Sequence, residues 1–552
     1  MTLRRPWALA ALAISSFALA SPALADVLID DVVGLTPDGK GGIERFTGIL
    51  IDDQGRVSAV YRDKDKRPKK VAYKVDGKRR VLVPGMIDAH AHVMEAGFAK
   101  MTLDLSGARS LEEALARVSA YVAAHPDRPW IEGRGWNQAS WGLDRMPTAA
   151  ELDRVTGGKP AFLKRVDGHA AWVNSAALKA AKVTATTPDP AGGRIERTSG
   201  SQEPSGVLID AAQALVGDKV PPPRPSDRDT AFGEAQLDFL RQGVTTVADM
   251  GTTIHDWQAY RRAADLGNLR IRVVAYAAGI DNMALIGGPG PTPWLHGDRL
   301  KMQGVKLYLD GALGSRGAWL KAPYADAPGT SGLPQVSETQ LGNLMSRAAI
   351  DNFQVAVHAI GDKANETVLD TIEQLSHTYK GDRRWRVEHA QVVDPADMAR
   401  FGQHGTIASM QPQHQESDRT MAEARLGPAR MAGAYAWKSI QGSGAVLAFG
   451  SDTPVEPASP FVGLAVAISP QGSTPERLSL GEALAAYTTG AARAVFAEDR
   501  LGRIARGMRA DFLFVDRDPT TASPEALRET KVLETWINGQ QAWSAAKGTA
   551  KR

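Results

Sequence analysis

The stretch VPGMIDAHAHVMEAG, residues 83–97, decides how the rest of the chain is interpreted. His90 and His92 stand two residues apart at the end of a short apolar run, and in a β-strand this spacing directs both imidazoles to the same face. Neighbouring neutral imidazoles are suitable ligands for a divalent transition metal such as zinc. Two ligands do not complete a metal site, so the other ligands must come from elsewhere in the chain.

Length and composition limit what those ligands can be. The chain has 552 residues, which suits one large enzyme domain with a smaller module. It contains no cysteine, which excludes a disulfide framework, a thiolate nucleophile and a cysteine-bound metal. A net charge of +3 gives no indication of nucleic-acid binding. Any metal must be held by His, Asp, Glu or a modified Lys. We expect a small-molecule substrate, and a homo-oligomer is left open.

Residues 1–25 have the pattern of a secretory signal peptide. Arg4 and Arg5 precede an apolar stretch, and an A-x-A cleavage site ends at Ala25. The apolar stretch is too short and wrongly flanked for a membrane span, so we expect no integral membrane segment after its removal. An uncleaved N-terminal anchor is the alternative. We expect a secreted protein located in the bacterial periplasm.

Short β-type runs separated by Asp and Gly turns occur at both ends of the chain. GILIDDQGRVSAV (48–60) is one near the start, and KVLETWINGQQAW (531–543) is one near the end. We expect residues 26–84 and 500–552 to form one composite β-sandwich, with the catalytic domain (85–499) inserted between them. Two separate small β-modules are the alternative.

A regular alternation of apolar, strand-like runs with helix-like segments in the second half of the chain predicts a (β/α)₈ barrel. Apolar runs alternate there with helix-like segments, and with the run before His90 they number eight. The other seven are GVTTVADM (243–250), RIRVVAYAA (270–278), GVKLYLDG (304–311), FQVAVHAIGD (353–362), WRVEHAQ (385–391), GTIASMQPQ (405–413) and AVLAFGSD (445–452). Residues from about 100 to 235 lack this alternation, and we expect them to be a large insertion that covers the entrance to the active site.

Polar residues mark the ends of five of these runs. They are His90 and His92, then Lys306, His358, His389 and Asp452. Each has a plain structural alternative, since a single histidine in an apolar strand is usually satisfied within the core and Lys306 with Asp452 could form an ion pair. A barrel gathers strand ends around one axis, so their joint occurrence favours a metal site.

Several segments together resemble the amidohydrolase superfamily, and within it the branch of N-substituted formamide deformylase. These segments are HAH after VPGMID, the lysine of GVKLYLDGALGSRGA, HAIGD, EHAQ and GSDTPVEP. The resemblance implies that His90, His92 and Asp452 bind a first metal and that His358 and His389 bind a second. It also implies an N6-carboxylated Lys306 that bridges them, since a deprotonated lysine can take up CO₂ and become an anionic ligand. One or two divalent ions, zinc foremost, are expected.

The expected reaction is hydrolysis of a C–N bond in a non-peptide amide, such as an N-acyl amine, an N-formyl amine or a cyclic amide. A bound divalent cation makes hydroxide available near neutral pH and polarises the carbonyl, and Asp452 is the expected catalytic proton acceptor and donor. Ser451 has no recognisable base beside it and is not expected to act as a nucleophile. The alternatives are a lactone or ester hydrolase with the same metal site, and a barrel that binds without catalysis.

Substrate contacts are expected from the insertion and the barrel loops. His169, in the segment DGHAAW, could reach the carbonyl or the leaving group, and a purely structural role is the alternative. Trp136, Arg316 and His414 are further expected contacts, followed by Arg134, Trp141 and Asp418. The aromatic residues could equally serve as packing within the insertion.

Overall fold

The central element of the fold is a nearly closed barrel of eight parallel strands. The computed structural model describes residues 26–471 and 475–548, so the expected signal peptide lies outside the described residues. The strands are paired in chain order: β6 (Met86–Ala91), β13 (Val244–Thr252), β14 (Arg272–Ala278), β15 (Leu300–Tyr308), β16 (Gln354–Ala359), β17 (Arg386–His389), β18 (Ile407–Met410) and β19 (Val446–Phe449). Each of the eight runs expected from the sequence overlaps one of these strands, and the predicted barrel is confirmed.

The two edge strands, β6 and β19, are joined by polar contacts rather than by a regular ladder. The Asp88 carboxylate accepts from the Ser451 backbone N–H (3.0 Å) and from the Ser451 hydroxyl (2.5 Å). The Asp452 N–H donates to the His90 carbonyl at 2.7 Å. The seam of the barrel therefore brings Asp452 beside the histidine pair, although 360 residues separate them in the sequence.

The barrel strands are buried on both faces, as expected for a parallel sheet covered by helices. Every residue of β6 and of β16 is buried. The helices of the barrel domain are α1 (Val93–Ala99), α6 (Pro225–Arg241), α7 (Ile254–Asp265), α8 (Gly279–Gly287), α9 (Glu338–Ile350), α10 (Asp362–Ser376), η2 (Met398–Gly402), α11 (Pro412–Ser417), α12 (Arg419–Leu426), η3 (Arg430–Gly433), α13 (Trp437–Gly442), α14 (Pro460–Ile468), α15 (Leu480–Ala486) and α16 (Thr489–Ala494).

Local sequence fixes where several of these helices begin. Thr253 precedes α7, and its hydroxyl accepts from the Asp256 N–H while the Asp256 carboxylate accepts from the Thr253 N–H. Ser337 and Gln340 form the same reciprocal pair at the start of α9. Each pair satisfies backbone donors that the first turn of a helix leaves free, and such a cap contributes about 1 kcal/mol.

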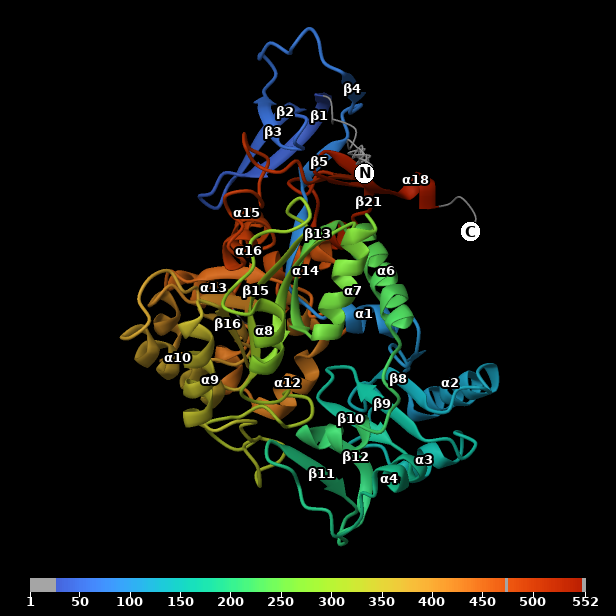
Figure 1. Ribbon diagram of the computed structural model, residues 1–552. Coiled ribbons are helices and arrows are strands. Elements are labelled where there is room, and N and C mark those ends of the chain that lie inside the picture. The colour runs from blue at the N-terminus through green and yellow to red at the C-terminus, as the bar shows by residue number, and fades with distance from the viewer. Residues whose placement is uncertain (1–25, 472–474, 549–552) are drawn as a thin grey trace, which may run out of the picture.

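Strands from both ends of the chain form a single sheet, which lies above the barrel in Figure 1. Its strands are β1 (Val27–Pro37), β2 (Ile43–Ile51), β3 (Val57–Tyr61), β4 (Tyr73–Asp76), β5 (Val81–Pro84), β20 (Phe512–Val515), β21 (Val532–Ile537) and β22 (Gln540–Ser544), accompanied by α17 (Pro524–Arg528) and α18 (Ala545–Gly548). The antiparallel pair β5–β20 joins the two ends. The expected sandwich is thus one continuous sheet that branches at β1, where β4 pairs with the first half and β5 with the second.

The irregular stretch after β6 folds as a unit of its own, which lies below the barrel in Figure 1. It consists of β7 (Leu103–Asp104), α2 (Leu111–Ala124), β8 (Ile131–Trp136), α3 (Ala149–Asp153), β9 (Ala161–Arg165), β10 (Ala170–Val173), α4 (Ser175–Ala181), β11 (Gly193–Arg197), β12 (Pro204–Asp210), η1 (Ala211–Gln213) and α5 (Ala214–Gly217). Its six strands form one sheet with a separate hydrophobic core. The insertion was expected to extend to about residue 235. In the structure it ends before α6, because α6 packs against α1 and α7 in the helical shell of the barrel.

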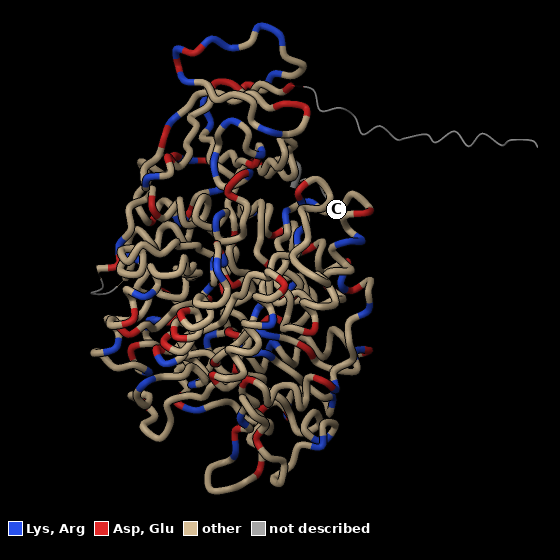
Figure 2. The backbone as a smooth tube through the Cα atoms, turned by 60° about the vertical axis from the view of Figure 1, so that its left-hand side comes forward, with Lys and Arg blue, Asp and Glu red and all other residues tan. Residues whose placement is uncertain are grey.

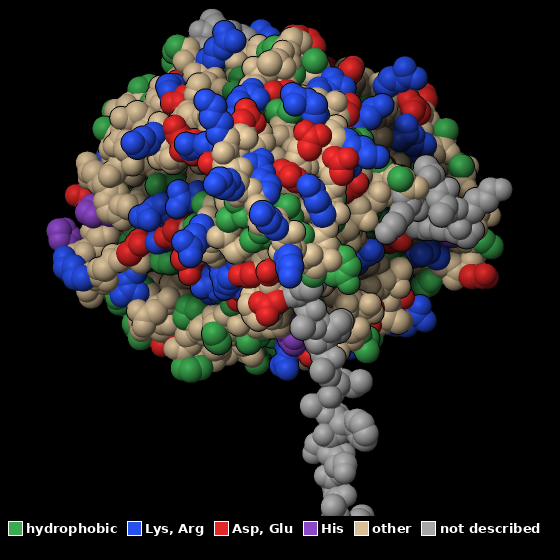
Figure 3. Space-filling view, turned by 90° about the horizontal axis from the view of Figure 1, so that it is seen from above, with side chains coloured by type: hydrophobic (Ala, Val, Ile, Leu, Met, Phe, Trp, Pro, Cys, Tyr) green, Lys and Arg blue, Asp and Glu red, His purple; other side chains and the backbone are tan. Residues whose placement is uncertain are grey.

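The charged residues are distributed over the whole molecule. Figure 2 shows both signs interspersed along the chain, and Figure 3 shows Lys and Arg side chains mixed with Asp and Glu on the face seen from above. Among the described helices, none is both long and apolar enough to cross a membrane.

Candidate metal centre

All six expected ligand residues lie at the carboxyl-terminal end of the barrel. His90 and His92 end β6 and begin the loop after it, Lys306 lies near the end of β15, His358 near the end of β16, His389 at the end of β17, and Asp452 follows β19. This is the end at which barrel enzymes carry their active sites. His389 and Asp452 have φ angles of 73° and 59°, a left-handed backbone that non-glycine residues seldom adopt and that often occurs at functional sites.

One group of three ligand atoms comes from His90, His92 and Asp452, which all lie within 4.8 Å of one another. The Asp452 Oδ1 atom is 3.1 Å from His92 Nε2 and 3.4 Å from His90 Nε2. Oδ1 is buried, and among the described residues it has no hydrogen-bond partner. A buried carboxylate oxygen without a donor is costly, and a cation between the three atoms would satisfy it. The donor set therefore fits a divalent metal.

A second group of three is formed by His389, His414 and Asp452. His414 Nε2 lies 3.4 Å from Asp452 Oδ2, and His389 Nδ1 lies 4.0 Å from the same atom. His358 had been expected as the partner of His389. Their ring centroids are 4.5 Å apart, and His358 Nε2 lies 3.4 Å from the Gly311 carbonyl oxygen. Both histidines thus lie near His389. The metal role of His358 stays a prediction, whereas His414 had been expected as a substrate contact.

The orientation of His90 is set by a buried ion pair that the sequence did not reveal. His90 Nδ1 lies 2.6 Å from Glu388 Oε2, which leaves Nε2 directed at Asp452. Arg386 donates to both Glu388 oxygens, at 2.6 and 3.2 Å. Glu388 directly precedes the expected ligand His389 in the segment EHAQ. This position beside a ligand was the one feature of the sequence that could have indicated a role for Glu388 in the site. Such partners fix the tautomer and direction of a ligating imidazole.

The electrostatic environment keeps the imidazoles uncharged, as metal binding requires. Burial lowers the pKa of His90 to about 4, helped by the nearby Lys306. Burial also lowers the pKa values of His358 and His389 well below the usual range. His414 differs, because Asp452 and Glu456 outweigh the effect of burial and raise its pKa to about 10. His414 is therefore positively charged in this structure and forms an ion pair with Asp452.

Lys306 is buried within the site, with Nζ 3.3 Å from His90 Nε2. Burial lowers the pKa of its ammonium to about 8. An uncharged amine is the form that reacts with CO₂ and the form compatible with neighbouring cations. The position is chemically suited to the carboxylation that the sequence resemblance implies.

The insertion contributes His169 to the wall of the site. His169 Nδ1 lies 2.6 Å from Asp210 Oδ1, and its ring centroid is 4.9 Å from that of His358. The loop after β15 packs tightly on this pair, because a Cβ atom on Gly311 would lie 2.3 Å from Asp210 Oδ2. Any larger residue at position 311 would therefore force the Asp210 side chain to move. The insertion is held against the barrel loop and directs His169 at the metal centre.

The candidate ligands border a cavity of about 270 Å³ that is lined by both the barrel and the insertion. His92, His358, His389, Lys306 and Asp452 line it from the barrel. A second cavity of about 80 Å³ shares His358, His389 and Asp452 with the first. The residues lining it also include His414 and Asp418. Both cavities are of a size and polarity that suit a small polar group beside the candidate metal ligands.

The structure places three of the expected substrate contacts away from these two cavities. Trp136 is fully buried in the core of the insertion, where its indole N–H donates to the Leu163 carbonyl at 2.7 Å. Trp141 packs in the same core and donates to the Ala108 carbonyl. Arg316 forms an ion pair with Asp326 at 2.9 Å and does not line the cavities described above. The aromatic residues form the core because a sheet of six strands needs its own apolar face covered.

A parallel barrel with imidazole and carboxylate ligands gathered at the carboxyl ends of its strands defines the class of metal-dependent hydrolases. Residues 75–542 match the model of the amidohydrolase family, and the chain belongs to this family.

Known relatives agree with this assignment. The chain is 35% identical over 476 residues to the putative amidohydrolase YtcJ of Bacillus subtilis (strain 168), covering 83% of this chain and 88% of the relative. It is 28% identical over 520 residues to the N-substituted formamide deformylase of Arthrobacter pascens, covering 88% and 93%. A crystal structure of an uncharacterized metal-dependent hydrolase from Pyrococcus horikoshii OT3 superposes with a TM-score of 0.72 at 27% identity, covering 91% of this chain and 99% of that one.

Proposed function

We propose that the protein hydrolyses a C–N bond of a non-peptide amide at a zinc centre held by His90, His92, Asp452 and their neighbours. The observation that carries the proposal is the buried Asp452 Oδ1, which lies 3.1 Å from His92 Nε2 and has no hydrogen-bond partner within the described part of the chain. A divalent cation at this position supplies Lewis acidity and lowers the pKa of water. The similarity to the N-substituted formamide deformylase of Arthrobacter pascens supports an amide substrate.

Asp452 is the group that moves the proton. Burial disfavours its charged form, but the surrounding imidazoles outweigh this and hold the pKa of its carboxyl well below the usual range. It is therefore an anion that can accept the proton of the attacking water and deliver it to the leaving nitrogen. His414, charged and 3.4 Å from Asp452 Oδ2, holds the carboxylate in place. His169 lines the same cavity from the insertion, and we expect it to contact the group being cleaved.

A substrate panel tests the proposal. We expect the metal-loaded protein to hydrolyse N-formyl and N-acyl amines or cyclic amides more efficiently than lactones, with the activity lost on chelation and regained with Zn²⁺. The measurement is kcat/KM for matched amide and lactone pairs. Turnover of lactones alone would instead support the ester-hydrolase alternative, and a fully metal-loaded protein that cleaves neither would contradict the proposal.

Metal stoichiometry tests the bridging role proposed for a carboxylated Lys306. We expect Lys306→Met to lower the metal content from two ions per chain to one or none, because the anion shared by the two ions is removed. Elemental analysis measures this directly. Lys301→Met is the matched control, since Lys301 lies at the beginning of the same strand and burial likewise lowers its pKa to about 8. An unchanged metal content in the Lys306 variant would contradict the bridging role.

Export to the periplasm belongs to the same proposal. It depends on the basic, apolar and A-x-A pattern of residues 1–25 alone. Fractionation of cells that express the full chain, with N-terminal sequencing of the product, tests it. A mature protein that begins at Asp26 in the periplasmic fraction is the expected result.

A further inference from the structure

A large groove lies beside the metal cavity, between the insertion and the barrel. Its volume is about 980 Å³, at the upper end of the roughly 300–1,000 Å³ that holds drug-sized ligands. The cavity and the groove share lining residues, among them His92, Arg134 and Tyr308, so the two spaces adjoin. The cavity of about 270 Å³ borders most of the candidate metal ligands, and the groove is additional space beside it.

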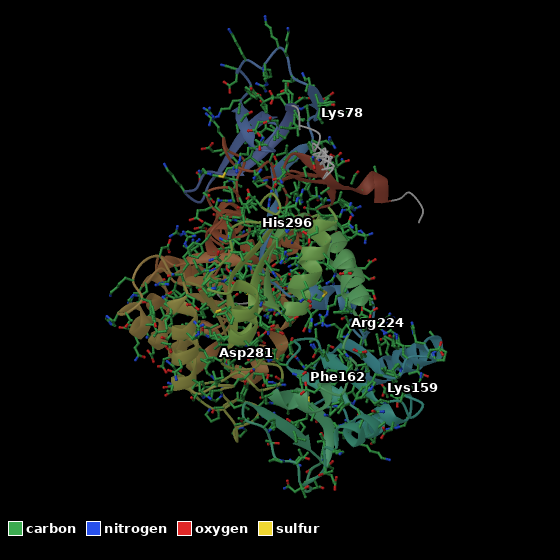
Figure 4. The ribbon with its side chains drawn as sticks, viewed as in Figure 1. Lys78, Lys159, Phe162, Arg224, Asp281 and His296 are labelled. Carbon is green, nitrogen blue, oxygen red and sulfur yellow. The ribbon has the colours of Figure 1, made fainter. Side chains whose placement is uncertain are left out.

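The groove has an apolar wall. Met94 and Phe98 of α1 line it from the barrel side, Phe162 of β9 from the insertion, and Pro221–Pro223 from the segment that leads into α6. Figure 4 places Phe162 on the insertion, below Arg224 at the start of α6. Side chains of this kind stabilise a bound apolar group by removing it from water, at about 0.8 kcal/mol for each buried methylene.

A buried cation stands at the junction of groove and cavity. Arg134 is 8% exposed and donates through Nη2 to the Val166 carbonyl at 3.0 Å, but its buried Nη1 has no hydrogen-bond partner among the described residues. The neighbouring Lys164 and Glu95 form an ion pair with each other at 2.9 Å. Arg134 is thus left with an unused donor at the point where a substrate would pass from the cavity into the groove. An anionic oxygen is the acceptor that a guanidinium binds most strongly.

We propose that the groove is a second substrate subsite, and that the amide cleaved at the metal centre carries a large apolar substituent in the groove and a carboxylate bound by Arg134. This rests on the proposed function for the identity of the scissile bond. The subsite itself is defined by binding, which can be measured without turnover.

Hydroxamic acids, which bind the metals through the hydroxamate, test the subsite by isothermal titration calorimetry on the metal-loaded full chain. We expect Kd to fall by about threefold to fourfold for each methylene added from acetohydroxamic to decanohydroxamic acid. A carboxylate beside the hydroxamate, as in 2-alkylsuccinyl monohydroxamates, should strengthen binding by about tenfold or more, and Arg134→Met should abolish that gain while leaving the chain-length dependence.

Blocking variants locate the apolar chain. Ala214 is exposed and lines the groove, so Ala214→Trp should flatten the chain-length dependence while acetohydroxamic acid binds as before. Gly217→Leu is a second blocking variant, because a Cβ there meets Phe162 at an ordinary 3.5 Å. Ala150→Trp, at an exposed position of the same insertion, is the control.

The outcomes separate the two proposals. A Kd that does not change with chain length, or a dependence that survives both blocking variants, overturns the subsite. A clear dependence without cleavage of any amide supports the subsite and contradicts the proposed function. Cleavage of amides with no dependence of Kd on chain length supports the proposed function and contradicts the subsite.

Discussion

Asp452→Asn is expected to lower kcat by about 10²- to 10⁴-fold, because an amide side chain cannot accept the proton of the attacking water. The change keeps the shape of the side chain and one oxygen atom, so the barrel seam formed by the Asp452 backbone N–H and the His90 carbonyl should persist. The measurement is kcat with the metal content determined on the same sample. A fall in rate with retained metal identifies proton transfer as the lost step.

Asp362→Asn is the matched control. Asp362 and Asp452 are each 7% exposed. Asp362, the first residue of α10, accepts a hydrogen bond from the Lys321 backbone N–H and does not line the two cavities at the metal centre. We expect its variant to retain the wild-type rate. Wild-type turnover in Asp452→Asn would contradict the role of Asp452 in proton transfer.

Arg386→Met is expected to lower the free energy of unfolding by about 3–5 kcal/mol, because Glu388 would remain buried and charged without its partner. Arg386 is fully buried and also donates to the Ala89 carbonyl, the Tyr276 hydroxyl and the Ser409 hydroxyl. Since Glu388 orients His90, metal affinity should fall as well, by about 10- to 100-fold. Denaturant unfolding and a metal titration against a competing chelator measure the two effects.

Two variants separate the stability effect from the metal effect. Arg272→Met removes an equally buried arginine that pairs with Asp511 at 2.7 Å at the opposite end of the barrel. It should destabilise the fold without changing metal affinity. Glu388→Gln added to Arg386→Met removes the unpaired charge and should restore part of the stability. If Arg272→Met lowered metal affinity as much as Arg386→Met, the orienting role of Glu388 would be contradicted.

The barrel could be predicted from the sequence because its signal is local and repeated. Parallel strands buried on both faces are continuous apolar runs, and their regular spacing with helices leaves one architecture. The expected ligands followed from the same pattern, since polar residues at the ends of such runs are conspicuous. His414, in contrast, reaches Asp452 from a short helix after β18, and only the folded chain brings it there.

The insertion shows why composition alone can mislead. Trp136 and Trp141, in an aromatic and glycine-rich segment, were expected at the substrate and instead form a separate core. Whether an aromatic residue faces a substrate or a neighbouring strand depends on sheet pairing, which couples residues far apart in the sequence. His169 from the same insertion does reach the site, because β12 ends at Asp210 beside it.

The sequence by itself determined the eight-stranded barrel and the positions of His90, His92, Lys306, His358, His389 and Asp452 at the ends of its strands. The tertiary structure alone decided how these groups face one another. That the β-strands from the two ends of the chain form one continuous sheet was decided by the tertiary structure. The left-handed backbone at His389 and Asp452, the Glu388–Arg386 pair behind His90, and the groove beyond Arg134 each depend on contacts between distant segments. Periodicity records which side of an element is buried, and it carries no information about which distant residue will fill the space opposite.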